Sequence, residues 1–135
     1  MINFQAMSSV SGQAYEDVVK MDLQGRGHLN IQEHVDLDDI GIEIDFLADG
    51  TYVECKGGYN GKKKRPGAKR TDNVKKSIAN GALLKSSRPG SEYIVYFSSK
   101  PRVGSFSDKM INTALKHGII DQVRYLGYSG SLKSE

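Results

Sequence analysis

The sequence contains a single cysteine, Cys55, among its 135 residues. One thiol excludes an internal disulfide and is too few for a structural zinc site. Apolar runs are no longer than about four residues, far short of the length that a membrane-spanning helix needs. The N-terminus lacks the basic start and apolar stretch of a secretory signal. We therefore expect a cytoplasmic protein that does not enter a membrane.

The composition indicates an ordinary globular domain. Hydrophobic residues make up 38% of the chain and charged residues 26%, and these fractions exclude a disordered, collagen-like or coiled-coil protein. The length suits one domain and leaves no room for a second. We therefore expect a single domain over residues 1–135, with a basic loop at 57–70 and a short polar C-terminal tail.

The positive charge is concentrated in one segment. The chain has 19 lysines and arginines against 16 acids, a net charge of +3. Six of these cations lie within nine residues that contain no acid, and without them the remaining 13 cations and 16 acids give −3. The six are Lys62, Lys63, Lys64, Arg65, Lys69 and Arg70. A basic segment on a slightly acidic body is typical of contact with a polyanion such as nucleic acid, although a solvated loop is the alternative.

The hydrophobic pattern predicts alternating helices and strands. Apolar residues spaced three or four apart indicate helices, and runs of β-branched and aromatic residues indicate strands. The predicted elements are a helix over 11–23, strands over 29–35, 42–47 and 51–56, a helix over 72–85, a central strand over 93–98, a helix that ends at Gly118, and a strand over 123–126. This order, α-β-β-β-α-β-α-β, predicts an α/β fold with a mixed sheet flanked by helices.

Each predicted helix has one inward face. Thr71 or Asp72 is expected to cap the second helix, and Ser107 the third, because short polar side chains accept hydrogen bonds from the first N–H groups. The residues expected inside are Ala14, Val18 and Met21 on the first helix, Val74, Ile78 and Ala82 on the second, and Met110, Ile111, Ala114 and Leu115 on the third.

The strands over 42–47 and 51–56 flank Asp49-Gly50, a strong signal for a two-residue hairpin turn. With this turn, Asp45 lies opposite Glu54 and Glu43 lies opposite Lys56, all on one face. The other face takes Ile44, Phe46, Val53 and Cys55. Opposed carboxylates repel each other, and a divalent cation between them removes the repulsion. Oxygen ligands suit Mg²⁺ or Mn²⁺.

Lys56 adds a cation to the same face as Glu54. An ammonium group beside carboxylates and a metal can hold a water and can stabilise charge that develops on a phosphate. The alternative role is a cross-strand ion pair with Glu43, worth only a few tenths of a kcal/mol. The glycines that follow, Gly57 and Gly58, leave room for a substrate backbone to approach.

Asp45, followed on the next strand by Glu54-Cys55-Lys56, resembles the motif of the PD-(D/E)XK nuclease superfamily, whose fold is restriction-endonuclease-like. The resemblance covers about residues 11–98, and Ile44 replaces the proline of the pattern. It implies metal-dependent phosphodiester hydrolysis, with two acids as ligands and the lysine near the attacking water. It also implies a further acid on the first helix, which Glu16 matches; a surface pair of Glu16 with Lys20 is the alternative.

These features together predict a magnesium-dependent deoxyribonuclease (or a manganese-dependent one). The expected catalytic residues are Asp45, Glu54 and Lys56, and the expected metal ligands are Glu16, Asp45 and Glu54. The expected DNA-binding residues are Lys62, Lys63, Lys64, Arg65, Lys69, Arg70 and Lys76. We expect DNA structure or ends to be recognised instead of sequence, and the resemblance makes a homodimer the default.

Four other functions remain open at this point. A Holliday-junction resolvase or an exonuclease would use the same fold, and a non-catalytic nucleic-acid-binding module would need only the basic loop. A ribosomal-type RNA-binding protein fits less well, because the chain outside the loop is acidic. His28, His34 and His117 do not have a metal-binding spacing along the sequence, so no histidine is expected at the site.

Overall fold

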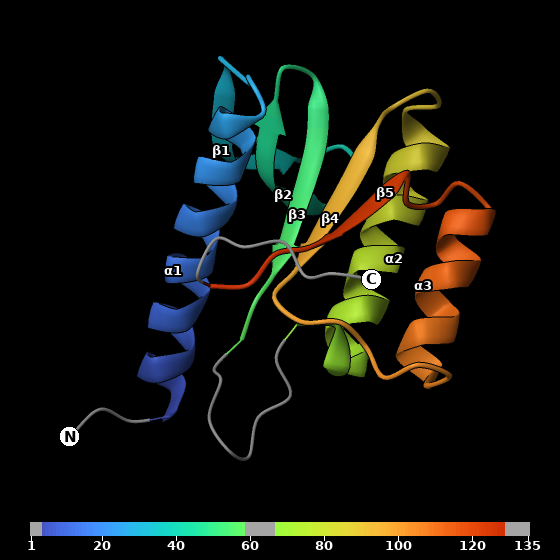
Figure 1. The fold of residues 1–135 in the computed structure, drawn as a ribbon. Helices are drawn as coiled ribbons and strands as arrows, with labels where there is room; N and C mark the ends of the chain where they lie inside the picture. Colours follow the sequence, from blue (N-terminus) through green and yellow to red (C-terminus); the bar gives the residue numbers. More distant parts are fainter. Residues whose placement is uncertain (1–3, 59–66, 129–135) are drawn as a thin grey trace.

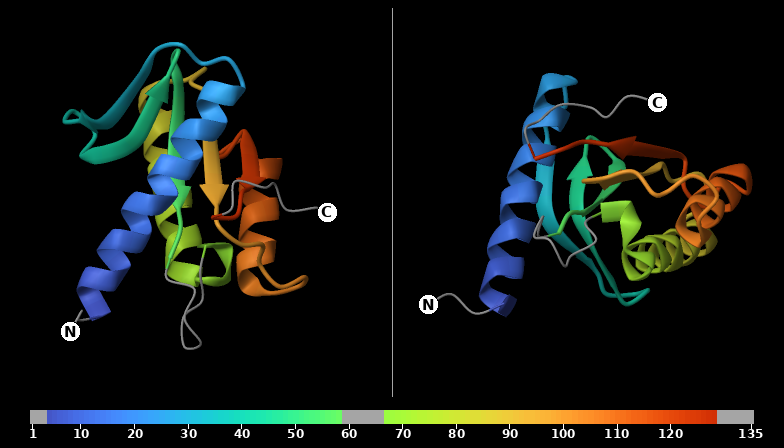
Figure 2. Two further views of the ribbon diagram at one scale, coloured as in Figure 1. Left: turned by 60° about the vertical axis from the view of Figure 1, so that its left-hand side comes forward. Right: turned by 60° about the horizontal axis from the view of Figure 1, so that its bottom comes forward.

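The computed structural model describes residues 4–58 and 67–128, with the side chains of 13–58 and 67–128. In these residues a five-stranded sheet lies between α1 on one face and α2 and α3 on the other (Figures 1 and 2). The elements are α1 (Phe4–Gly25), β1 (Ile31–Leu37), β2 (Ile42–Ala48), β3 (Thr51–Lys56), the 3₁₀-helix η1 (Gly67–Lys69), α2 (Thr71–Ser87), β4 (Tyr93–Phe97), α3 (Phe106–Lys116) and β5 (Gln122–Tyr125). The predicted order of elements is confirmed.

The sheet is mixed, with the strands in the order β1-β2-β3-β4-β5. The first three form an antiparallel meander, and β3, β4 and β5 are parallel. β4 is buried along its whole length inside the sheet, although the middle position belongs to β3. The helices α2 and α3 connect the parallel strands, so both begin at the edge where β3 and β4 end. In α/β proteins this carboxyl edge is where ligands usually bind. Among the described residues, no helix is both long and apolar enough to cross a membrane.

The hairpin between β2 and β3 has the predicted turn, and the predicted register holds for the three residue pairs next to it. Asp49 and Gly50 have φ values of 49° and 90°, as a tight two-residue turn requires, and Ala48 pairs with Thr51. The paired ladder extends only to Phe46 and Val53, so the predicted pairing of Asp45 with Glu54 is not formed. The prediction that Glu43 lies opposite Lys56 is wrong, because beyond this point β2 pairs with β1 alone, and Glu43 faces Asp36 there.

At His34 and Asp45 the regular alternation of side chains between the two faces of the β1–β2 hairpin is interrupted. Phe46 packs against α1, whereas Ile44 packs in the cluster beneath α2 and α3. In an unbroken strand two residues spaced in this way share a face. His34 has a φ of 52°, and the β1–β2 ladder skips its pairing with Asp45. The expectation that Ile44 shares a face with Phe46 is therefore wrong, because the strand is interrupted between them.

The buried stripe of α1 lies one residue around the helix from the expected one. Tyr15, Val19 and Leu23 are buried against the sheet, and the Tyr15 hydroxyl donates a hydrogen bond of 2.8 Å to the Leu126 carbonyl. Met21 is 70% exposed. Ala14 is exposed as well, and Val18 is only partly buried. The side chains of the observed stripe are larger than those of the expected stripe. Their burial removes more apolar surface from water, so this face of the helix packs on the sheet.

The other two helices depart from the prediction at their faces and caps. The buried residues of α2 are Val74, Ser77, Gly81 and Leu84, while Ala82 is exposed. On α3, Ile111 and Ala114 are buried as expected, Met110 is partly buried, and Leu115 is 36% exposed. Neither Thr71 nor Asp72 caps α2, which begins after Arg70 without a side-chain cap. Ser105, not Ser107, caps α3, so Ser107 lies inside the first turn.

Gly57, directly after Lys56, holds α1 close to the end of β3. A Cβ on Gly57 would lie 2.8 Å from the Tyr15 Cβ and 2.6 Å from the Tyr128 hydroxyl. The absence of a side chain here therefore has a packing role, because it allows α1 to approach the strand that carries Glu54 and Lys56.

We expect Gly57→Ala to destabilise the fold by roughly 1–3 kcal/mol, since α1 must move to relieve the overlap. Gly25→Ala is the matched control, because a Cβ there would meet no atom within 4 Å. Urea unfolding of both variants measures the difference. Equal stability of the two variants would show that α1 does not depend on Gly57.

Candidate functional site

Side chains of Glu16, His34 and Asp45 meet from α1, β1 and β2. One ligand atom of each lies within 4.8 Å of the others. The His34 Nε2 atom is 3.1 Å from Glu16 Oε1, and its Nδ1 atom is 3.2 Å from Glu43 Oε1. His34 was not expected here, because its contacts with Glu16 and Asp45 come from the fold and have no signature in the spacing of histidines along the chain.

Asp45 lies where β2 separates from β3. The backbone N–H of Cys55 donates a hydrogen bond of 2.9 Å to Asp45 Oδ2, and the Cys55 thiol is 3.5 Å from the same oxygen. Burial, followed by the charge of Asp45, raises the pKa of this thiol well above its ordinary value, so Cys55 stays a neutral donor. These contacts fix the Asp45 carboxylate beside β3.

Glu54 is a buried acid, only 2% exposed. Burial and then the charge of Asp45 raise its pKa to about 8, and Lys56 opposes the shift. The Lys56 Nζ atom lies 3.5 Å from Glu54 Oε2. Burial and then Asp45 also raise the pKa of Glu16, while His34 lowers it. Asp45 thus couples to both of the other acids expected to bind metal.

The Glu16 carboxylate lacks a full set of partners. Its Oε1 atom is buried and accepts no hydrogen bond from the described residues, although His34 Nε2 is near in distance. Buried carboxylate oxygens without donors are uncommon and costly. Carboxylates with one imidazole fit a divalent cation. Glu43, bonded to the other ring nitrogen of His34, would orient that ligand. The residues present therefore fit a metal ion.

Neither of the alternative ion pairs is formed. Lys20 bonds to Glu33 at 2.8 Å, not to Glu16. Lys56 contacts Glu54, and Glu43 contacts His34. Glu54 and Lys56 are thus brought together as predicted, whereas Glu43 is not part of a pair with Lys56.

The two ends of the basic loop meet beside β3. The Gly67 N–H donates a hydrogen bond of 3.0 Å to the Gly57 carbonyl, so η1 begins next to Lys56. Of the predicted DNA-binding residues, Lys69 and Arg70 are exposed at this edge, and Lys76 is exposed on α2. The remaining ones, Lys62, Lys63, Lys64 and Arg65, lie outside the described residues.

We expect the metal-free protein to lose stability as the pH rises from about 5 to 8. The pKa values of Glu16 and Glu54 are raised, the latter to about 8, so the folded state retains protons that the unfolded state releases. His34 acts in the same direction, because a hydrogen bond to Glu43 and then the charge of Glu16 raise its pKa. While the two states differ by one proton, the loss is about 1.4 kcal/mol per pH unit.

Melting temperatures in EDTA across this range measure the slope. Glu54→Gln should flatten it, and Asp38→Asn, which changes an exposed acid in the β1–β2 turn, should leave it unchanged. A flat or rising melting temperature in the wild-type protein would contradict the prediction.

Comparisons with known proteins identified no relative of the chain. No family model, curated protein or solved structure matches the chain.

Proposed function

We propose that the protein is a divalent-metal-dependent nuclease that hydrolyses phosphodiester bonds in DNA. The observation that carries this proposal is the cluster of Glu16, His34 and Asp45. The charge of Asp45 also acts on Glu54, the buried acid that lies 3.5 Å from the Lys56 ammonium group. We further propose a restriction-endonuclease-like core of the PD-(D/E)XK type. The helix followed by an antiparallel meander, and the acids on adjacent strands, support this assignment.

Glu16, Asp45 and Glu54 would hold a Mg²⁺ or Mn²⁺ ion, with His34 as an additional nitrogen ligand. A bound divalent cation supplies positive charge to a phosphate oxygen and lowers the pKa of a water. The carboxylates neutralise the ion and fix its place beside β3. The Cys55 N–H keeps Asp45 oriented toward this place.

Lys56 has the geometry for a direct part in the reaction. Its side chain is 22% exposed, so the ammonium group can reach a substrate while it remains beside Glu54. There it can donate a hydrogen bond to the attacking water and stabilise the charge that builds on the phosphate. Hydrolysis adds this water across one P–O bond, and Lys56 orients it for that attack.

Lys69, Arg70 and Lys76 would contact backbone phosphates from the same side of the molecule. Such contacts position DNA without reading its sequence. A junction resolvase and an exonuclease would use the same site, and a homodimer would bring two sites to the two strands of a duplex. A binding module without catalysis is separated from all of these by a single criterion, the requirement for metal in strand scission.

We expect Asp45→Asn, Glu54→Gln and Lys56→Ala each to lower cleavage by about 10²-fold or more, because each removes charge from the site. Supercoiled, linear, single-stranded and branched DNA, with magnesium, manganese or EDTA, are the substrates to compare. Asp38→Asn and Lys116→Ala are the matched controls, since both residues are exposed and lie on other elements.

Full activity in all three site variants would contradict the nuclease proposal. Metal-independent DNA binding without scission of any substrate would favour the binding module. The pattern of products on linear, circular and branched DNA distinguishes endonuclease, exonuclease and resolvase.

A second experiment tests the role of His34. Imidazole binds manganese more readily than magnesium, so cleavage should be faster in manganese, and His34→Asn should reduce this advantage. Asparagine tolerates the positive φ of residue 34, which keeps the backbone intact. Glu43→Gln should weaken the metal affinity by about 10-fold or more, because it removes the partner of the ring. An unchanged ratio of rates in His34→Asn would exclude His34 as a ligand.

A further inference from the structure

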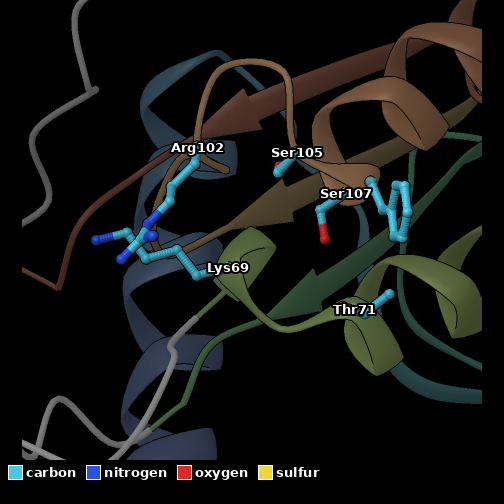
Figure 3. Close-up of a pocket in the computed structure, with 6 residues that line it drawn as sticks. Lys69, Thr71, Arg102, Ser105 and Ser107 are labelled. Carbon is cyan, nitrogen blue, oxygen red and sulfur yellow. The ribbon is translucent and has the colours of Figure 1, made fainter.

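A polar cavity lies at the carboxyl edge of the parallel strands, apart from the acidic cluster. It has a volume of about 300 Å³ and opens between the first turns of α2 and α3 (Figure 3). This is near the lower end of the range of roughly 300–1,000 Å³ for small-molecule sites. The cavity is lined by Lys69, Thr71, Arg102, Ser105, Phe106 and Ser107.

Two helix N-termini face this cavity. α2 has 17 residues and begins without a side-chain cap. α3 has 11 residues, and the side chain of its cap residue Ser105 accepts a hydrogen bond from the Asp108 N–H. The first N–H groups of a helix have no partner within the helix, and its dipole favours negative charge there. Together the two ends form a surface suited to an anion.

The hydroxyl group of a largely buried residue points into the same space. Ser107 is 5% exposed, and its oxygen is directed between the starts of α2 and α3 (Figure 3). Its side chain makes no hydrogen bond within residues 13–58 and 67–128. Because Ser105 is the cap, this hydroxyl is available to a ligand.

Two cations lie at the rim of the cavity. Lys69 and Arg102 both line it and are exposed, and in Figure 3 their side chains extend toward the same side. Neither forms an ion pair with another residue in the described part of the chain. The nearby acid Asp108 accepts a hydrogen bond from Gly104 N–H and does not line the cavity. The charge of this cavity therefore favours an anion.

We propose that this cavity is a phosphate-binding site. Two helix N-termini, two cations that form no ion pair with the described residues, and the Ser107 hydroxyl provide the donors that a tetrahedral oxyanion requires. If the proposed nuclease function holds, the ligand is a phosphate group of the DNA substrate, either a terminal monoester or a backbone diester. Gly67 bonds to Gly57, the residue after Lys56, so a phosphate held here lies along the same edge of the sheet as the lysine.

The site is tested first with inorganic phosphate in EDTA, by a titration that follows backbone amide signals in NMR spectra. Saturable shifts are expected at Thr71, Phe106 and Ser107. The double variant Lys69→Gln/Arg102→Gln should weaken affinity about tenfold or more, and Ser107→Ala should weaken it severalfold. Lys116→Gln, which removes a lysine at the opposite end of α3, should leave the affinity unchanged.

Absence of saturable shifts at these amides would overturn the site, as would an equal loss in Lys116→Gln. Because the rim cations are exposed, their removal does not threaten folding, and the dispersion of the NMR spectrum verifies the fold of Ser107→Ala. No metal and no cleavage enter this titration. A failed nuclease assay therefore leaves the phosphate site intact, and a failed titration leaves the nuclease proposal intact.

The source of the phosphate is tested with one short oligonucleotide, with and without a 5′-phosphate, in the presence of calcium. Tighter binding of the phosphorylated form, lost in the double variant, assigns the terminal monoester. Equal binding of both forms, weakened in the double variant, assigns backbone phosphates. Equal binding that the double variant retains would overturn the assignment to DNA.

Discussion

The candidate site depends on one hydrogen bond, which the Cys55 N–H donates to the carboxylate of Asp45 at 2.9 Å. Up to Phe46, β2 is joined to β3 by backbone pairing. Beyond that residue, the Asp45 side chain takes the place of a ladder partner and lies where the two strands separate. From this position its charge acts on Glu16 from α1 and on Glu54 from β3. The left-handed backbone of His34 marks the same interruption on β1. The acidic cluster therefore arises from one local departure from regular sheet geometry.

The features that local chemistry determines could be predicted from the sequence. The Asp49-Gly50 turn follows from the preference of these residues for positive φ, and the turn sets the register of Ala48 and Thr51. The face of α1 could not be predicted in this way. The stripes through Ala14 and through Tyr15 both have helical spacing. The second is selected by burial against residues far away in the chain, and the Tyr15 hydroxyl also bonds to the Leu126 carbonyl, 111 residues away. The prediction of the face of Ile44 was wrong for a related reason, because the alternation of side chains assumes an unbroken strand.

The acids and the lysine were found from the sequence, whereas His34 and Ser107 were not. Asp45, Glu54 and Lys56 are close in a hairpin, so a local pattern is enough to relate them. His34 reaches Glu16 only through the packing of α1 on β1. Ser105 and Ser107 both suit a helix cap, and the residue chosen depends on where the backbone enters the helix. That choice leaves the Ser107 hydroxyl in the cavity instead of at the cap.

The same edge of the sheet carries two groups of charge that do not neutralise each other. Glu16 and Glu54 have raised pKa values, while Lys69 and Arg102 form no ion pair within the described residues. Direct pairing between the two groups would stabilise the metal-free fold. The chain keeps them on separate elements instead, and the apolar clusters on both faces of the sheet supply the stability that this arrangement costs. A metal cation bound by the acids and a phosphate bound by the cations would neutralise both groups. The proposed substrate and cofactor therefore account for a charge distribution that folding alone does not favour.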